Sequence, residues 1–223
     1  MSSWRRAVPV LLLALASVGV APPAQAETSR HVVPISWARA LPLGAVVTVE
    51  GTATTPSGAF ESSFFDQGFA IQDRSAGIYV STAVDLDVAP RDKVRVTGTL
   101  RDSSGLRVLV PTDPAAVRVR GTGPAVQPRR LTTGAVGEAT EGLLVRVVAT
   151  ITRAPASDEP YGHKFFVDDG SGELTIFVNT QTGIDLTGLA VGQTVRVTGF
   201  SSQYDTHYEI DPRFPDDIAV RRR

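Results

Sequence analysis

The sequence contains no cysteine. Disulfide bonds therefore cannot stabilise the chain, and thiolates are excluded as metal ligands and as catalytic nucleophiles. Attachment of a lipid through cysteine is excluded for the same reason. If the chain works outside the cytoplasm, its stability must come from packed apolar cores.

Long apolar runs are absent beyond the first 26 residues, where no stretch approaches the roughly 18 apolar residues of a membrane-spanning helix. The start of the chain joins the basic MSSWRR to the apolar AVPVLLLALASVGV and to AQA, Ala24–Ala26, which has a small residue at its first and third positions. This order is typical of a Sec-type signal peptide. We expect cleavage after Ala26 and a secreted or periplasmic mature protein with no membrane span. A retained N-terminal anchor is the alternative.

An excess of basic charge is also missing. Removal of residues 1–26 leaves 22 − 2 = 20 basic residues against 23 acidic ones, a net charge of −3. A protein held to nucleic acid mainly by phosphate contacts is expected to be basic. Residues 39–120 hold nine basic and nine acidic side chains, whereas residues 129–223 hold ten and thirteen. If one half of the chain binds a polyanion, these counts favour the first.

Signatures of common catalytic sites are missing too. The sequence has no P-loop, no nucleophile elbow and no carboxylate pair at a recognisable acid–base spacing. The stretch DDGSGE, Asp168–Glu173, lacks the alternating acidic ligands of a calcium loop, and a glycine-rich hairpin turn explains it better. We therefore predict a non-enzymatic chain with no catalytic residue, no cofactor and no metal site.

What the sequence does contain is an internal repeat at an offset near 100 residues. KVRVTGTL from Lys93 recurs as TVRVTGFS from Thr194, and GAVVTVEGTAT from Gly44 matches GLLVRVVATIT from Gly142. FAIQDRSAGIYVS matches FFVDDGSGELTIFVN, with two extra residues assigned to the turn, and LRVLVPTDPAAVRV matches HYEIDPRFPDDIAV. The matched segments follow the same order in both halves, which predicts a duplicated domain.

Each half reads as five short strands, because apolar residues alternate and β-branched residues are enriched. The expected strands are 46–55, 69–73, 78–81, 94–100 and 106–110 in the first half, and 143–153, 165–168, 174–178, 195–200 and 208–211 in the second. Gly51 within the first strand suggests a bulge that lets this strand serve two sheet edges.

This order of strands, with an insertion between the third and the fourth, is that of the OB-fold, a partly open Greek-key barrel. We predict an all-β chain of two tandem five-stranded OB-fold barrels. The predicted domains are 35–120 and 129–223, joined by the glycine- and proline-rich linker 121–128. A generic small β-sandwich is the alternative.

The segments GFAIQD, GIYV and KVRVTG in the first half, and EGLLVRVVATIT in the second, resemble the OB-type modules that accompany secreted bacterial nucleases and phosphodiesterases. The resemblance covers nearly all of the mature chain. It implies OB-folds of the nucleic-acid-binding type. The matching motifs are structural, so the resemblance carries over no catalytic residue.

OB barrels bind ligands on the outer face of their second and third strands and on the flanking loops, where bases stack on aromatic rings. Alternation along the strands places Phe69, Ile71, Ile78 and Val80 inside the first barrel, and Phe165, Val167, Ile176 and Val178 inside the second. Tyr79 and Phe177 then face outward, at positions that the repeat makes equivalent. Each ring could instead cover a barrel wall or the interface between the barrels.

The candidate ligand-binding residues combine these two rings with other outward positions and with loop residues. They are Tyr79, Phe177, Phe166, Gln72, Phe65, Arg95, Tyr161, Tyr204 and His207. Arg95 recurs as Arg196 at the same strand position, where phosphate contact and packing of the aliphatic stem are both open.

The loop Pro56–Asp73 carries four of the nine phenylalanines of the chain. Phe60 and Phe64 are four residues apart, so a short helical turn could lay both over the open end of the barrel. Phe65 and Asp66 would then lie nearest to the ligand.

In the second half, the loops Ala156–Lys164 and Ser201–Asp211 are expected to meet at one end of the barrel. They would bring together Tyr161, Tyr204, His207 and other polar residues. The simplest interpretation is a set of polar loop tips with scattered histidines. The functional alternatives are an aromatic cleft for bases or sugar rings, and a divalent metal held by His163, His207 and Asp205.

The function that these features favour is weak, low-specificity binding of single-stranded nucleic acid or oligonucleotides by an exported protein. The competing hypothesis is an accessory module that binds an exported protein or a glycan, for which a near-neutral surface is more natural.

Overall fold

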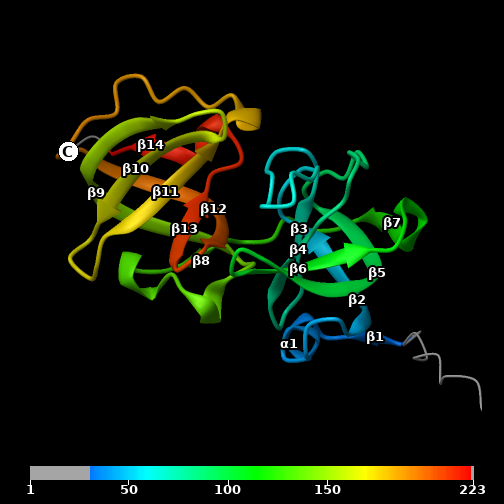
Figure 1. The fold of residues 1–223 in the computed structure, drawn as a ribbon. Coiled ribbons are helices and arrows are strands. Elements are labelled where there is room, and N and C mark those ends of the chain that lie inside the picture. Colours follow the sequence, from blue (N-terminus) through cyan, green and yellow to red (C-terminus); the bar gives the residue numbers. More distant parts are fainter. Residues whose placement is uncertain (1–30, 222–223) are drawn as a thin grey trace, which may run out of the picture.

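The structure, a computed structural model, describes residues 31–221, and its regular secondary structure is almost wholly β-strand (Figure 1). The predicted signal peptide lies outside the described residues. Within residues 31–221, the longest α-helix has five residues, and none of the helices there is long and apolar enough to cross a membrane.

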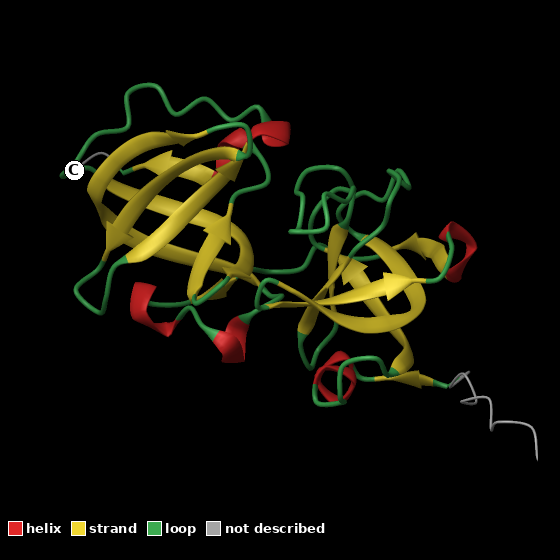
Figure 2. Cartoon of the chain, viewed as in Figure 1, coloured by secondary structure: helices red, strands yellow, loops and turns green. Residues whose placement is uncertain are grey.

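The strands follow one another in the same order in both halves, with short helices between some of them (Figure 2). The first half contains β1 (Val32–Val33), α1 (Ile35–Arg39), β2 (Val46–Ala53), β3 (Phe69–Gln72), β4 (Gly77–Val80), β5 (Asp92–Ser103), β6 (Leu106–Pro111), the 3-10 helix η1 (Pro114–Ala116) and β7 (Val117–Thr122). The second contains β8 (Arg129–Arg130), η2 (Thr133–Ala135), η3 (Glu138–Thr140), β9 (Leu144–Asp158), β10 (Gly162–Asp168), β11 (Leu174–Asn179), η4 (Thr180–Thr182), β12 (Thr194–Tyr204), β13 (His207–Asp211), η5 (Pro215–Asp217) and β14 (Ile218–Val220).

Each half closes into a five-stranded barrel. The first barrel runs β2-β3-β4-β6-β5 and is closed by pairing of β5 with β2; the second runs β9-β10-β11-β13-β12 and is closed by pairing of β12 with β9. Both are the Greek-key order of an OB-fold, which confirms the predicted fold class. A two-sheet sandwich is excluded because the first and fourth strands of each unit hydrogen-bond to each other.

The duplication extends beyond the barrels. A two-residue strand, β1 or β8, pairs in parallel with the first barrel strand of each unit. At the other end, β7 or β14 pairs with the fourth barrel strand. Each unit therefore carries the same two extra strands on the outside of the same barrel wall.

The cores follow the alternation expected from the sequence. Phe69, Ile71, Ile78 and Val80 are buried in the core of the first barrel, and Phe165, Val167, Ile176 and Val178 are buried in that of the second. Successive side chains of a strand point to opposite faces, so the intervening residues lie outside the barrels.

Gly51 lets β2 serve two sheet edges, but without the expected bulge. The register of β2 against β5 is continuous from Val46 to Thr52, while Thr52 also pairs with Gln72 of β3. A β-carbon on Gly51 would lie 3.1 Å from the backbone of Gln72, so the close approach of the two strands depends on glycine.

Two expected loops of the second half are largely strand. β9 extends to Asp158 and β10 starts at Gly162, so most of Ala156–Lys164 belongs to one hairpin. Likewise, β12 extends to Tyr204 and β13 starts at His207, so the turn between them has only two residues. Tyr161 consequently lies in the turn between β9 and β10, and Tyr204 is the last residue of β12.

The strand register corrects the proposed equivalence of Tyr79 and Phe177. Tyr79 pairs with Val108 of β6. Glu209 of β13 corresponds to Val108, and it pairs with Thr175. The counterpart of Tyr79 is therefore Thr175, and Phe177 lies two residues further along its strand. The two extra residues that the sequence alignment assigned to the turn do not exist there. Because the shift is two residues, both rings still face outward.

The helical turn expected to place Phe60 and Phe64 together is also wrong. The segment has no regular structure; Phe60 is buried, but Phe64 is 45% exposed. The carboxylate of Asp66 organises this loop instead, because it accepts hydrogen bonds from the backbone NH and the hydroxyl of Ser62.

The barrels pack against each other through an apolar cluster outside both barrel cores. Phe200 of β12 inserts among Phe60, Ala70, Tyr79 and Val108 of the first barrel. Its ring centroid lies 6.2 Å from that of Phe60 and 5.8 Å from that of Tyr79. The outer face of β3 and β4, where OB-folds bind ligands, is therefore occupied in the first unit by a side chain of the second.

Polar contacts also cross this interface. Glu141 is buried and accepts hydrogen bonds from the Arg39 side chain (2.9 Å) and from the backbone NH of Arg107 (3.1 Å). The guanidinium of Arg213 donates to the backbone carbonyl of Thr54 at 2.7 Å. Burial raises the pKa of Glu141, although the nearby Arg39 acts in the opposite direction.

Candidate functional site

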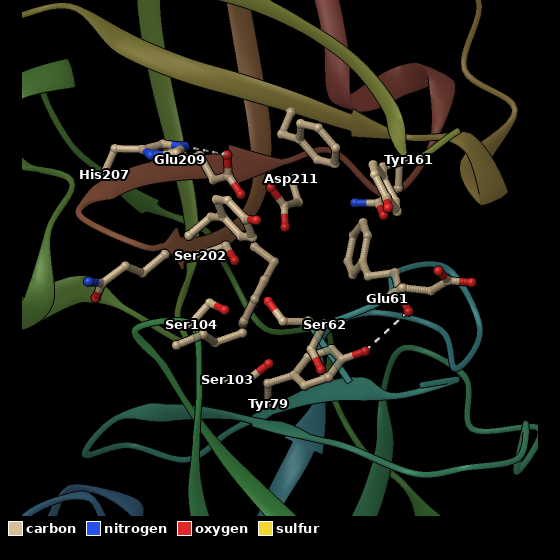
Figure 3. Close-up of a pocket in the computed structure, with 18 of the residues that line it drawn as sticks. Glu61, Ser62, Tyr79, Ser103, Ser104, Tyr161, Ser202, His207, Glu209 and Asp211 are labelled. Atoms are coloured by element: carbon tan, nitrogen blue, oxygen red, sulfur yellow. Dashed lines mark hydrogen bonds and ion pairs between the residues drawn. The ribbon is translucent and has the colours of Figure 1, made fainter. Parts of the chain in front are cut away.

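A cavity of about 560 Å³ lies where the two barrels meet, lined from both sides (Figure 3). The first barrel contributes the loop after β2 and the turn between β5 and β6. The second contributes β11, β12, β13 and the β9–β10 hairpin. Cavities of this size accommodate molecules of the dimensions of a nucleoside.

The floor of the cavity is rich in hydrogen-bond acceptors. Glu209 and Asp211 project from β13 at alternate positions, and both are buried. The matching residues of the first barrel are Val108 and Val110, so the second unit has acids where the first has apolar side chains. Figure 3 shows both carboxyl groups beside Ser202.

Asp211 is the most perturbed of these acids. Burial, followed by the negative charge of Glu209, raises its pKa well above the usual range. Its Oδ1 atom has no hydrogen-bond partner within the described part of the chain. A buried acceptor without a partner is costly, and a ligand that donates a hydrogen bond to it would remove that cost.

His207 borders the acidic floor. Its Nε2 lies 3.5 Å from Glu209 Oε2, and this hydrogen bond is the main reason why the pKa of His207 is raised. The ring of Tyr204 meets that of His207 edge-on, with centroids 5.9 Å apart. The imidazole thus bridges the buried carboxylate and an aromatic ring at the cavity edge.

Exposed rings surround the mouth. Phe65 is 68% exposed, and its centroid lies 6.3 Å from that of Tyr161, which comes from the other barrel. Tyr204 is 55% exposed, while Phe177 is partly buried on the wall. Lys164 lies near the same mouth but is held by Asp158 at 3.2 Å. The rim therefore offers flat apolar faces above an acidic floor.

Tyr79 borders the cavity but has no free ring face, since it is 1% exposed under Phe200. Its hydroxyl lies 2.8 Å from Asp66 Oδ1 and 3.1 Å from the backbone carbonyl oxygen of Phe60. Burial and the adjacent Asp66 raise its pKa well above the usual value. We therefore do not retain Tyr79 as a stacking residue.

Six of the nine candidates from the sequence border this cavity: Tyr79, Phe177, Phe65, Tyr161, Tyr204 and His207. The other three do not. Gln72 Oε1 accepts a hydrogen bond from the backbone NH of Leu144 at the interface, Phe166 lies under the guanidinium of Arg153, and Arg95 pairs with Glu50.

The alternative metal centre of His163, His207 and Asp205 does not form. His163 points to Glu159 at 3.9 Å, while His207 points to Glu209. Among residues 31–221, no three histidine, aspartate or glutamate side chains gather in a group that could hold a metal ion.

Sequence reasoning missed Glu209, Asp211 and Phe200. The signal for the two acids was present, because HYEID in the second unit places carboxylates where LRVLV in the first has valines. No such signal marked Phe200, since its partners come from the other barrel.

Comparison with known proteins gives one curated relative of note. The chain is 27% identical over 184 residues to endonuclease YhcR of Bacillus subtilis strain 168, a match that covers 78% of this chain. The chain spans only 15% of the length of that relative. This similarity agrees with the resemblance to OB modules of bacterial nucleases. No family model matches the chain.

Solved structures share the general architecture only distantly. A murine DNA-binding protein bound to double-stranded DNA matches with a TM-score of 0.40 at 12% identity, over 79% of this chain and 97% of that one. A replication protein A heterotrimer bound to single-stranded DNA matches with a TM-score of 0.34 at 14% identity, over 44% of this chain and 84% of that one.

Proposed function

We propose that the chain is an exported, non-enzymatic pair of OB-folds that binds single-stranded nucleic acid or short oligonucleotides, with a base entering the cavity between the barrels. The observation that carries this proposal is the combination of exposed rings at the mouth, Phe65, Tyr161 and Tyr204, with buried acceptors on the floor. The similarity to part of an endonuclease supports the same class of ligand.

The chemistry of a base suits both parts of the cavity. Its flat face stacks on an aromatic ring, at about 1–3 kcal/mol per base. Its exocyclic amino group donates to carboxyl oxygens, as cytosine N4 does to aspartate or glutamate. A phosphate, by contrast, is repelled by the negative charge of Glu209. The base therefore enters the cavity while its phosphates stay outside.

This arrangement favours single strands. A base paired within a duplex presents neither a free face nor a free Watson–Crick edge, so it must be unpaired and unstacked before it can enter. Because the stacking surfaces accept any base, we expect little sequence specificity.

The test compares binding of a labelled single-stranded oligonucleotide by the wild type and by the double variant Tyr161→Ala, Tyr204→Ala. Removal of two stacking rings should weaken binding by at least roughly tenfold. Trp37→Ala is the matched control, since Trp37 is 52% exposed, like Tyr161, but does not border the cavity. Unchanged binding by the folded double variant would contradict the proposal, and cleavage of the oligonucleotide would contradict its non-enzymatic part.

A glycan is the second candidate ligand. Sugar rings also stack on aromatic side chains, and their hydroxyl groups donate to carboxylates such as Glu209. A glycan array measured beside the oligonucleotide assay separates the two. Binding of glycans but not of oligonucleotides would reassign the cavity.

A further inference from the structure

The outer wall of the second barrel carries four arginines that converge on a hollow of about 370 Å³. Arg130 comes from β8, Arg146 from β9, Arg196 from β12, and Arg221 follows β14. Leu131 and Val148 complete the lining. The hollow lies on the wall formed by β8, β9, β12 and β14, whereas the cavity between the barrels is bordered by β11, β12 and β13.

These arginines have no acidic partner within residues 31–221. The carboxylate of Asp217 raises the pKa of Arg146, but Asp217 accepts hydrogen bonds from the Nε and Nη2 atoms of Arg213 at 2.8 and 2.9 Å. Its charge is therefore matched by Arg213. The four guanidiniums around the hollow keep a net positive charge.

The strand register places like charges directly opposite each other. Arg130 pairs with Arg146 across β8 and β9. Like charges in such positions destabilise a sheet. Burial and the neighbouring Arg196 and Arg130 lower the pKa of Arg146, in keeping with that repulsion. A bound anion would relieve it.

Arg146 is also held in place. Its Nε donates to Thr198 Oγ1 at 2.8 Å. This hydrogen bond fixes the plane of the guanidinium, and a planar guanidinium with free NH groups is suited to bidentate contact with a phosphate.

The first barrel serves as an internal comparison. Val32 and Thr48 occupy the positions of Arg130 and Arg146 there, according to the strand pairings. Arg95 and Arg196 occupy the same position in the two barrels but have different partners. Arg95 lies opposite Glu50 and forms an ion pair with it at 3.2 Å, whereas Arg196 lies opposite Val148. Against these changes, Arg118 of β7, which pairs with Arg95, is matched by Ala219 in the second unit. The second unit thus has one more arginine and one acid fewer on this wall.

We propose that Arg130, Arg146, Arg196 and Arg221 form a binding site for the phosphodiester backbone of a nucleic acid strand. The total charge of each half pointed to the first barrel as the better polyanion binder, but the local arrangement of unpaired charge favours the second. This site is separate from the base-binding cavity and does not depend on it.

Both sites include residues of β12. Arg196 lies near its start and Tyr204 at its end, eight residues apart, which is roughly 26 Å along a β-strand. Phe200 lies between them and is covered by the first barrel, so a nucleic acid strand that binds both sites must pass around this contact. Only a probe of several nucleotides is long enough to do so.

The experiment measures binding of two single-stranded probes over a range of salt concentrations: an ordinary oligodeoxynucleotide and an abasic one of the same length, which keeps the phosphodiester backbone but has no bases. Arg146→Ala, Arg196→Ala should weaken binding of both probes by at least roughly tenfold at low ionic strength. The dependence of log affinity on log salt should fall by about 0.7 for each phosphate that the variant can no longer bind.

Two further variants make the test specific. Val148→Glu places beside Arg196 the carboxylate that Arg95 has in the first barrel, and it should weaken binding without removing any arginine. Arg118→Ala, Arg120→Ala is the control, because it removes two exposed charges from β7 of the first barrel. We expect a loss much smaller than that of Arg146→Ala, Arg196→Ala. Thermal unfolding of each variant shows that it is folded.

The outcomes separate the two proposals. The backbone site is overturned if the abasic probe fails to bind the wild type, or if it binds the folded Arg146→Ala, Arg196→Ala variant with unchanged affinity and salt dependence. It is also overturned if the control variant loses more than that variant does. Equal affinity of the wild type for the ordinary and abasic probes would instead contradict the base-binding cavity and leave the backbone site standing.

Discussion

Phe200 of the second barrel stacks on Phe60 of the first, with ring centroids 6.2 Å apart and ring planes inclined by 23°. The contact joins two residues that are distant in the sequence and that belong to neither barrel core. Together with Tyr79 it makes the face of the first barrel an internal docking surface. The two barrels should consequently behave as one cooperative unit, and the face that remains open to ligands lies mainly on the second.

Replacement of Phe200 by alanine tests this coupling. Loss of a fully buried phenylalanine should lower the free energy of unfolding by about 3–5 kcal/mol and separate the unfolding of the two barrels into two transitions. Differential scanning calorimetry measures both effects. Phe214→Ala is the control, because Phe214 is 38% exposed and should cost below about 1 kcal/mol. A single transition with an equally small loss for both variants would show that the interface does not couple the barrels.

Gly77 marks a second point of close approach between the barrels. A β-carbon there would lie 1.9 Å from the carbonyl oxygen of Gly142, which no side-chain rearrangement can relieve. Gly77→Ala should therefore destabilise the chain by roughly 1–3 kcal/mol or shift the barrels apart. Denaturant unfolding measures the loss. At Gly137 a β-carbon would meet only the ring of Tyr208, at 4.0 Å, so Gly137→Ala should be close to neutral; equal losses for the two variants would contradict the expectation.

Asp211 should make stability depend on pH. Its pKa is raised in the folded state, so between its unfolded value near 3.8 and its folded value the native protein binds more protons than the unfolded chain. Stability from this group is then complete below the unfolded pKa and is lost as the pH rises toward the folded pKa. Asp211→Asn removes the titration, so its melting temperature should exceed that of the wild type by an amount that grows as the pH rises above about 4. A difference that stays constant with pH would contradict this assignment.

The predicted signal peptide gives a direct prediction about the mature chain. When the full sequence is produced in a bacterium with its export machinery intact, the exported protein should begin at Glu27. Mass spectrometry of the intact exported protein measures this. A mature chain that still begins at Met1 would instead favour the retained anchor.

We propose that residues 35–120 and 129–223 are the two domains, with 121–128 as the linker. Each barrel closes on itself through its own first and fourth strands. A fragment of residues 129–223 would, however, expose Phe200, so it should fold but associate more readily than the whole chain. Analytical ultracentrifugation of the fragment and of its Phe200→Ala variant compares the two.

The sequence by itself determined the barrels. The period-two alternation of Phe69–Ile71 and of Phe165–Val167 is a local property of the sequence. It shows which side chains of a strand face the core, and this does not depend on which other strand it pairs with. The duplicated order of segments then required the same closure twice. For the same reason the sequence showed that Tyr79 and Phe177 point outward.

Only the tertiary structure decided what the outward residues meet. Tyr79 is covered because Phe200 packs on it from the other barrel. Arg196 has no acidic partner within residues 31–221 because the strand register sets Val148 rather than an acid opposite it. Partners of this kind come from segments far apart in the chain, and neither alternation nor total charge specifies how such segments dock. The cavity is therefore a property of the assembled pair of barrels, and the arginine cluster is a property of the strand register of the second barrel. Neither belongs to a single stretch of sequence.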